Sequence, residues 1–258
     1  MISIRFASKH PPCRKPLRTF ASTVVRSLVL GFCLAPPAHA DYSPYQGLVE
    51  MPQVMAPMVT GVLATENLRL LMEDQARGAT GDKTRPAASP SGLVAPPRGG
   101  ASRTAHELAL RYPPDQRPQI EQAFSESLVA YKKLEAKFGV TSDDVAGAVA
   151  AYIAGNYMAY RDVDFPDSNF KPLVAQMRAV LARNTGFLRA SGEDKRALYE
   201  QLAITGTFMA VTRETIRRQG ADPQVADNFR KAAQANLEQF LKIDANRISI
   251  TAQGLVIL

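Results

Sequence analysis

Cysteine, histidine and tryptophan are scarce in this 258-residue chain. It has two cysteines, three histidines and no tryptophan, and both cysteines, Cys13 and Cys33, lie in the first 40 residues. If those residues are removed, the rest of the chain has no disulfide, no thiol nucleophile and no thiolate metal ligand. His106 is then the single histidine, which excludes a zinc site built from several imidazoles. The Gly-x-Ser-x-Gly turn that carries the nucleophile of α/β-hydrolases is also absent. The sequence predicts no cofactor.

The first 40 residues also lack acidic side chains, although they contain six basic ones. An apolar run from Ser27 to Ala35 follows the basic residues, and Pro36-Pro37 then precedes Ala38-His39-Ala40. This order is typical of a secretory signal peptide that ends in small residues at its cleavage site. We therefore expect cleavage after Ala40 and a periplasmic or secreted protein.

Cys33 offers an alternative, because the sequence from Leu30 to Cys33 distantly resembles the lipid-attachment motif of lipoproteins. Phe32 stands where that motif needs a small residue, and the apolar stretch before it is short. Cleavage after Ala40 is the favoured interpretation.

Without the leader, the chain has almost no net charge. The whole sequence has 31 Lys and Arg against 24 Asp and Glu, and six basic and no acidic residues precede Asp41, so 25 remain against 24. A near-neutral protein has no electrostatic attraction for nucleic acid, which we do not expect as a partner. No later segment has the ~20 consecutive apolar residues that cross a bilayer, so we expect no integral membrane span.

Composition divides the remaining chain into three parts. Residues 76–103 are rich in Gly, Pro, Ala and Ser and have no apolar periodicity, which predicts a flexible linker. Residues 41–75 before it are apolar, so part of this segment is expected to dock on the body, beside Ile248 and Ile250, or to engage a partner. Residues 104–258 are long enough for one hydrophobic core.

Residues 104–258 have the periodicity of helices. Apolar residues recur at three- and four-residue spacing in successive segments, with Gly139, Gly186 and Gly220 at segment ends. Near Ile248 the pattern changes to alternation, which indicates an extended tail or a short strand. The predicted fold is all-α, a compact bundle of about five or six helices. The expected helix starts are Thr141 with Asp144, Ser191 with Asp194, and Asp222-Pro223.

A row of small residues distinguishes the expected helix from Asp143 to Tyr160. Gly, Ala, Gly and Ala recur at every fourth position, and a similar row occurs later in the chain. Residues without bulk let two helix backbones approach closely, so we expect the two helices to cross there. The rows are Gly147, Ala151, Gly155 and Ala159, and Ala203, Gly206 and Ala210.

Polar aromatic residues lie beside the first small row, at Tyr152, Asn156, Tyr157 and Tyr160. Tyrosine hydroxyls in an apolar setting line ligand pockets in some proteins and form internal hydrogen-bond networks in others. These four residues are the candidate ligand-binding site, and no catalytic or metal-binding residue is predicted. The acidic run from Asp162 to Asp167 predicts a turn, because Asp167 and Leu173 replace the Gly and Glu of a calcium-binding EF-hand.

Five stretches of the body are distinctive in sequence: Asp144 to Tyr160, Phe165 to Asp167, Phe170 to Leu173, Leu198 to Leu202, and Ile250 to Gly254. Together they resemble a family of exported proteobacterial proteins that is known only as a domain of unknown function. The resemblance covers most of Thr104 to Gly254 and implies an exported helical domain, with no activity attached to it.

These observations favour an exported, non-enzymatic helical protein that binds another protein or an envelope component. The alternative is a periplasmic small-molecule binder or a carboxylate-using hydrolase, with its site beside Tyr152, Asn156 and Tyr160. A surface pocket there with a converging acidic side chain favours the alternative, whereas a shallow apolar groove favours the interaction protein.

Overall fold

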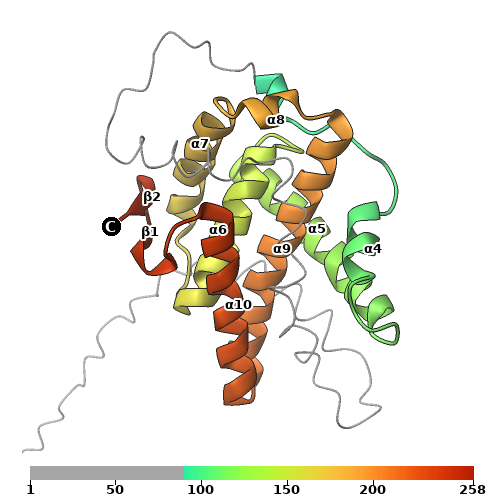
Figure 1. The fold of residues 1–258 in the computed structure, drawn as a ribbon, viewed down its shortest axis with the longest axis vertical. Helices are drawn as coiled ribbons and strands as arrows, with labels where there is room; N and C mark the ends of the chain where they lie inside the picture. The colour runs from blue at the N-terminus through green and yellow to red at the C-terminus, as the bar shows by residue number, and fades with distance from the viewer. Residues whose placement is uncertain (1–89) are drawn as a thin grey trace, which may run out of the picture.

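The computed structural model describes residues 90–258, and these residues fold into an all-α body that ends in a small β-hairpin, as the sequence predicts (Figure 1). The described part has seven α-helices, one more than the expected upper number, because the five-residue α8 has too few residues to show periodicity. The α-helices are α4 (Arg103–Ala109), α5 (Arg117–Phe138), α6 (Val145–Arg161), α7 (Phe170–Leu181), α8 (Thr185–Arg189), α9 (Gly192–Gln219) and α10 (Pro223–Leu241). The 3-10 turns are η2 (Pro90–Leu93), η3 (Asp167–Asn169) and η4 (Ala245–Arg247), and the strands are β1 (Ile248–Thr251) and β2 (Gly254–Ile257).

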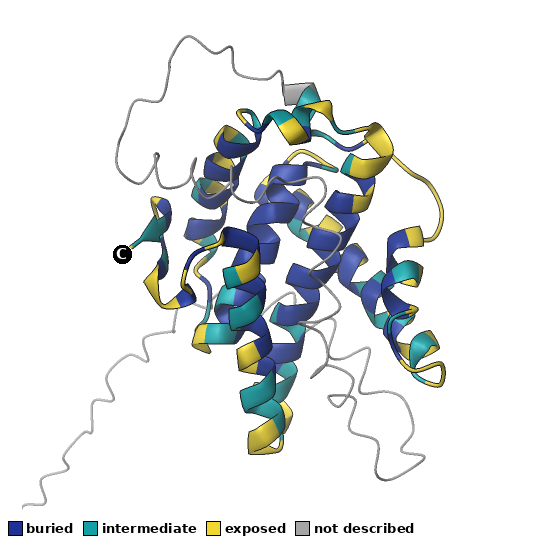
Figure 2. Ribbon diagram, in the orientation of Figure 1, coloured by how far each residue is buried: buried dark blue, intermediate teal, exposed yellow. Residues whose placement is uncertain are grey.

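Helix α6 is the centre of the body, and its burial follows from its sequence. It consists almost entirely of apolar and small residues, and most of its length is buried (Figure 2). A helix that is apolar on every side is stable only when other elements surround it. Helices α7, α9 and α10 contact α6, and α5 and α4 pack beyond α9. Figure 1 therefore shows the order hairpin, α7, α6, α9, α5, α4 across the molecule.

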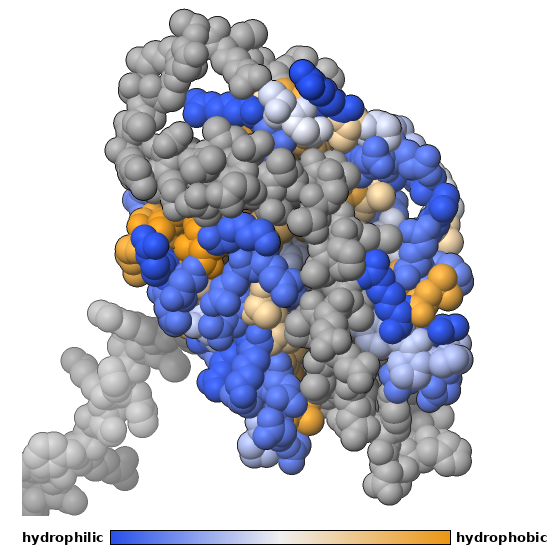
Figure 3. Space-filling view, in the orientation of Figure 1, coloured by the Kyte–Doolittle hydropathy of each residue, from blue (hydrophilic) through white to orange (hydrophobic). Residues whose placement is uncertain are grey.

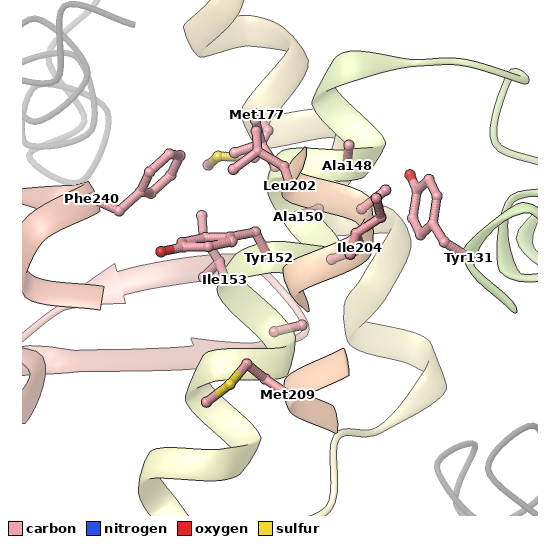
Figure 4. Packing of buried hydrophobic residues seen from close by; sticks show 14 of the residues in the cluster. Tyr131, Ala148, Ala150, Tyr152, Ile153, Met177, Leu202, Ile204, Met209 and Phe240 are labelled. Carbon is pink, nitrogen blue, oxygen red and sulfur yellow. The ribbon is translucent and has the colours of Figure 1, made fainter. Parts of the chain in front are cut away.

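The core forms where side chains from these helices meet around α6. Tyr152 and Ile153 of α6 lie close to Phe240 of α10, with Met177 of α7 and Leu202 of α9 beside them (Figure 4). The rings of Tyr152 and Phe240 have centroids 4.8 Å apart. This cluster buries the apolar surface that stabilises the fold.

The predicted close crossing of two small-residue rows is present between α6 and α9, but at the middle of the rows only. A Cβ atom on Gly155 would overlap the carbonyl group of Gly206, and one on Gly206 would lie 2.5 Å from Cα of Tyr152. Gly147 instead faces α5, where a Cβ would lie 2.6 Å from the Tyr131 hydroxyl. An every-fourth-residue row drifts about 40° per step around an α-helix, so Gly147 and Gly155 point about 80° apart.

Most expected helix ends are confirmed. Gly139 ends α5 in the left-handed conformation, Ser191 and Asp194 form a capping box on α9, and Asp222 caps α10 with Pro223 in its first turn. The capping box expected at Thr141 is wrong. Asp144 itself is the N-cap of α6, where its side chain accepts a hydrogen bond from the Ala146 N–H.

The β-hairpin packs on α7 through a side-chain amide. Strands β1 and β2 are antiparallel, with Ile250 opposite Leu255. The Gln176 side chain accepts a hydrogen bond from the Leu255 N–H at 2.7 Å and donates one to the Leu255 carbonyl at 2.9 Å. The expected alternating tail is therefore a real strand, and a glutamine of α7 occupies the outer edge of its partner strand.

The packed body begins before residue 104. Leu93 and Ala95, which composition placed in a flexible linker, are buried in the core, and Val94 forms an antiparallel bridge with Asp144. We call residues 92–102 the strap, because they cross from η2 to the start of α4 over the N-terminal end of α9. The first part of the predicted linker and residues 41–75 lie outside the described residues.

Within residues 90–258, no helix has the length and apolar character that a membrane crossing requires.

Candidate functional site

The first part of the candidate Tyr/Asn line is an internal network. Tyr152 and Asn156 are buried. The Asn156 amide donates to the Tyr152 carbonyl at 2.8 Å, and its Oδ1 accepts from the Asn236 side chain of α10 at 2.9 Å. The Tyr152 hydroxyl points to the Asn236 carbonyl at 3.4 Å, and burial raises the Tyr152 pKa. These groups hold α6 against α10, and a ligand would reach them only after α10 had moved.

The second part of the line lies nearer the surface. Tyr157 is half-buried and packs on the core, whereas the Tyr160 hydroxyl donates to Oδ1 of Asn246 at 2.7 Å. Asn246 lines an open depression at the C-terminal end of α10, and the exposed surface of α10 is largely hydrophilic (Figure 3). The structure therefore places Tyr152 and Asn156 in an internal network, Tyr157 against the core, and Tyr160 beside a residue that lines the depression. The lining residues are Gln234, Glu238, Lys242, Ile243, Asp244 and Asn246.

Both acidic residues of this depression already hold the loop that forms it. Glu238 accepts hydrogen bonds from the Ala245 N–H at 3.2 Å and from the Gln234 amide at 2.9 Å. Asp244 caps η4 by accepting from the Asn246 N–H at 2.8 Å. A carboxylate that anchors its own loop is poorly placed to move a proton for a substrate. The depression suits the binding of a polar ligand better than catalysis.

A second polar site, which the sequence did not predict, is buried between α5 and α9. We call it the Glu135 cluster, and it is built from residues one helical turn apart on each helix. Tyr131 and Glu135 lie on one face of α5, and Arg196, Tyr199 and Glu200 lie on the facing side of α9. The Tyr199 hydroxyl donates to Oε2 of Glu135 at 3.0 Å. The two tyrosine rings pack edge to face, with centroids 5.8 Å apart. Its members are Tyr131, Glu135, Asp143, Asp144, Arg196, Tyr199 and Glu200.

Burial gives the Glu135 cluster unusual proton affinities. Glu135 is only 3% exposed, and desolvation raises its pKa from 4.5 to about 7, although the hydrogen bond from the Tyr199 hydroxyl opposes this shift. Desolvation also raises the pKa values of Tyr131 and Tyr199, and the nearby Glu135 carboxyl adds to both shifts. Glu135 therefore changes charge near neutral pH, whereas both tyrosines stay protonated.

Arg196 connects the Glu135 cluster to the strap. Its side chain is almost fully buried and pairs with the Asp143 carboxylate at 2.8 Å. The same guanidinium donates from Nε to the Pro96 carbonyl at 2.7 Å and from a second nitrogen to the same oxygen. Its planar group also stacks on the Tyr199 ring, 5.1 Å from the centroid. A guanidinium is suited to this position because its fixed fork of donors serves several acceptors at once.

Further contacts fix the strap along its length. The Ala95 N–H donates to the Asp143 carbonyl at 2.9 Å, and Lys195 Nζ donates to the Gly92 carbonyl at 3.2 Å. At the other end, the Ser102 hydroxyl donates to Glu200 at 2.8 Å and accepts from the Ala105 N–H, so it also caps α4. These polar contacts join the strap to the Glu135 cluster, to α9 and to α4.

The acidic loop between α6 and α7 is a structural site, as the predicted turn implies. Arg213 of α9, which is buried, pairs with Asp162 at 2.9 Å and with Asp164 at 2.7 Å. Lys137 of α5 reaches Asp167 at 3.1 Å. Within residues 90–258, no group of three or more His, Cys, Asp or Glu side chains is arranged to hold a metal ion.

One signal for the Glu135 cluster was present in the sequence. Glu135 occurs four residues after Tyr131 and three residues before Phe138, so it lies on the apolar face of α5, where a carboxylate is unusual. The partner residues on α9 could not be paired with it from sequence, because they come 61 or more residues later and the pairing depends on how the two helices cross.

The fold and its buried polar cluster define an all-α domain whose N-terminal strap is fixed to its longest helix. The sequence profile of the family of unknown function DUF6683 matches residues 22–258, and the chain belongs to this family. The match is longer than the resemblance noted between Thr104 and Gly254, because it includes the strap and the preceding residues from 22 onward. Neither the curated proteins nor the solved structures contain a significant match.

Proposed function

We propose that the chain is an exported protein that binds another protein or an envelope component, and that the partner is bound at the strap end of the body. The leader of basic residues, apolar run and Ala38-His39-Ala40 supports export to the periplasm or beyond.

The observation that carries the proposal is the way the strap is fixed. The strap is the part of the chain that leads into the helical body, and Arg196, Lys195 and Asp143 hold it at a defined place. A free linker would need none of these contacts. Ordering a chain segment costs conformational entropy, so these contacts favour a defined place for residues 92–96, beside which we propose that the partner binds.

Photo-crosslinking from two positions tests this proposal. Helix α9 is about 40 Å long, so its two ends give well-separated probes. A photoreactive residue at exposed Arg98 in the strap reports on one end, and the same residue at exposed Gln224, just after α9, is the matched control. With the full exported chain in its own envelope, we expect a crosslinked partner from position 98 and none from position 224. Equal products from both positions, or none from position 98, would contradict the proposal.

The depression beside Tyr160 favours a second candidate, a small-molecule binder. It places the carboxylates of Glu238 and Asp244 and the amide of Asn246 around one open surface, and a ligand with several hydroxyl or amine groups would match these oxygens. The test is a thermal-shift screen of polar metabolites. Binding at this site requires a shift that is lost in Asn246→Ala and kept in Gln224→Ala.

A further inference from the structure

Tyr199, Arg196 and Asp143 connect Glu135 to the strap. The Glu135 carboxyl accepts a hydrogen bond from the Tyr199 hydroxyl at 3.0 Å, and Arg196 stacks on the Tyr199 ring. Arg196 in turn holds the Pro96 carbonyl and pairs with the Asp143 carboxylate, and the Asp143 carbonyl accepts from the Ala95 N–H. A change at Glu135 therefore reaches the strap through Tyr199 and Arg196.

The backbone of Asp143 adopts an uncommon conformation. Its φ is 61°, in the left-handed region that residues other than glycine rarely occupy. Such a conformation persists when the surrounding contacts compensate for its cost. The contacts of Asp143 with Ala95 and Arg196 supply that compensation, so weakening one of them favours a different backbone conformation and the loss of the other.

The charges around Glu135 are unevenly balanced. The loop before α6 contributes the carboxylates of Asp143 and Asp144, and α9 contributes Glu200. The opposing cations are Arg196 of α9 and Arg178 of α7, which pairs with Asp144 at 2.7 Å. Three carboxylates thus face two guanidinium groups while Glu135 is neutral. Tyr131 and Tyr199 complete the surroundings of Glu135 and carry no charge.

We propose that the Glu135 cluster is a proton-controlled clasp, in which ionisation of Glu135 loosens the strap through Tyr199, Arg196 and Asp143. The fourth negative charge has no cation of its own, and in this proposal it gains contact with water when residues 92–96 and Asp143 separate from the body. The proposed clasp involves this chain alone, so its test does not depend on whether the chain binds a partner.

The direction of the pH dependence follows from the position of the carboxyl. Because the closed arrangement raises the Glu135 pKa from 4.5 to about 7, it binds a proton more tightly than the open one. The stabilisation of the closed strap is complete below pH 4.5 and is lost as the pH rises through about 7. If the open state restores the ordinary carboxyl pKa, linkage gives an opening equilibrium that grows by up to about 70-fold between pH 5 and pH 8.

Hydrogen exchange of the Ala95 amide tests the clasp, because this N–H bonds to Asp143 itself. The full mature chain is measured at pH 5, 6, 7 and 8, with rates corrected for the intrinsic pH dependence of exchange. We expect protection at Ala95 to fall between pH 5 and pH 7 and to level off above. Protection in the core of α10, around Leu237, should not change. In Glu135→Gln, protection at Ala95 should be independent of pH.

Two further variants distinguish titration of Glu135 from titration of another residue. Tyr199→Phe removes a hydrogen bond that lowers the Glu135 pKa. The loss of protection at Ala95 should therefore move to higher pH in this variant. This result tests the proposal even if Glu135→Gln does not fold. Histidine side chains titrate near neutral pH, and His106→Gln should leave the transition in place. A wild-type strap with constant protection, or a transition that is lost in His106→Gln and kept in Glu135→Gln, would overturn the proposal.

Discussion

Adding one methyl group at the crossing of α6 and α9 should strongly destabilise the protein. In Gly155→Ala, the new Cβ would overlap the Gly206 carbonyl, which belongs to a backbone and can yield only if the two helices separate by more than an ångström. Alanine would otherwise stabilise α6 by about 1 kcal/mol, since glycine is a poor helix former. Overpacking of a core lowers the free energy of unfolding by about 1–3 kcal/mol or more. Because the neighbour of Gly155 is a rigid backbone, we expect the cost here to be at or above the upper value of this range. We expect a net loss of about 2–3 kcal/mol.

Gly147→Ala on the same helix is the matched comparison. Its Cβ would meet the Tyr131 hydroxyl at 2.6 Å and Val140 Cγ1 at 2.9 Å, and both contacts are side-chain atoms, which yield more readily than a helix backbone. The same gain in helix propensity applies, so the net change should stay within about 1 kcal/mol. Gly99→Ala, which adds the methyl in open space, is the neutral control.

Urea denaturation and thermal denaturation, each followed by far-ultraviolet circular dichroism, measure all three variants. At about 2–4 °C per kcal/mol for a domain of this size, Gly155→Ala should melt about 5–10 °C below the wild type. If Gly155→Ala is as stable as Gly147→Ala, the close approach of the two backbones is not a determinant of stability and the reasoning fails.

Three other measurements test separate features of the chain. Ser191→Ala removes the capping box of α9 and should lower the free energy of unfolding by about 1 kcal/mol; an unchanged urea midpoint would show that the cap is dispensable. Between pH 5 and pH 8, the free energy of unfolding of the wild type should fall by on the order of 2–3 kcal/mol relative to that of Glu135→Gln. The reason is that the raised pKa of Glu135 favours the folded state only while the carboxyl is protonated. Parallel curves of stability against pH would contradict this. Mass spectrometry of the exported protein should find Asp41 as its first residue, and a retained leader or a lipid on Cys33 would refute cleavage after Ala40.

The helices were predictable to the extent that local rules determine them. Gly139, Ser191 and Asp222 end or begin helices in the structure because their capping chemistry involves only neighbouring residues. The sequence predicted Thr141 as a cap with Asp144 as the third residue of its capping box, whereas Asp144 is the cap in the structure. The difference depends on the left-handed turn at Asp143, which tertiary contacts hold in place. Local rules therefore fail where a distant segment, here the strap, determines the backbone.

The polar sites were predictable only in part, for the same reason. The line from Tyr152 to Tyr160 was visible because its members share one helix, but its partners Asn236 and Asn246 come from α10 and the following loop. The proposal that this line binds a ligand stays a prediction. The Glu135 cluster needs residues from α5, α9 and the loop before α6, and no pattern along the chain brings these together.

The Gln176 contact with the hairpin has a consequence for how the protein meets other chains. A β-strand at a sheet edge offers unpaired N–H and C=O groups to any other extended peptide, and this is a common route to aggregation. The Gln176 side-chain amide forms hydrogen bonds with both the N–H and the C=O of Leu255 on that edge. Another molecule therefore cannot add a strand at Leu255 without first displacing a buried side chain. The N–H of the exposed Leu258 beyond it already donates to the Arg247 carbonyl at 2.7 Å.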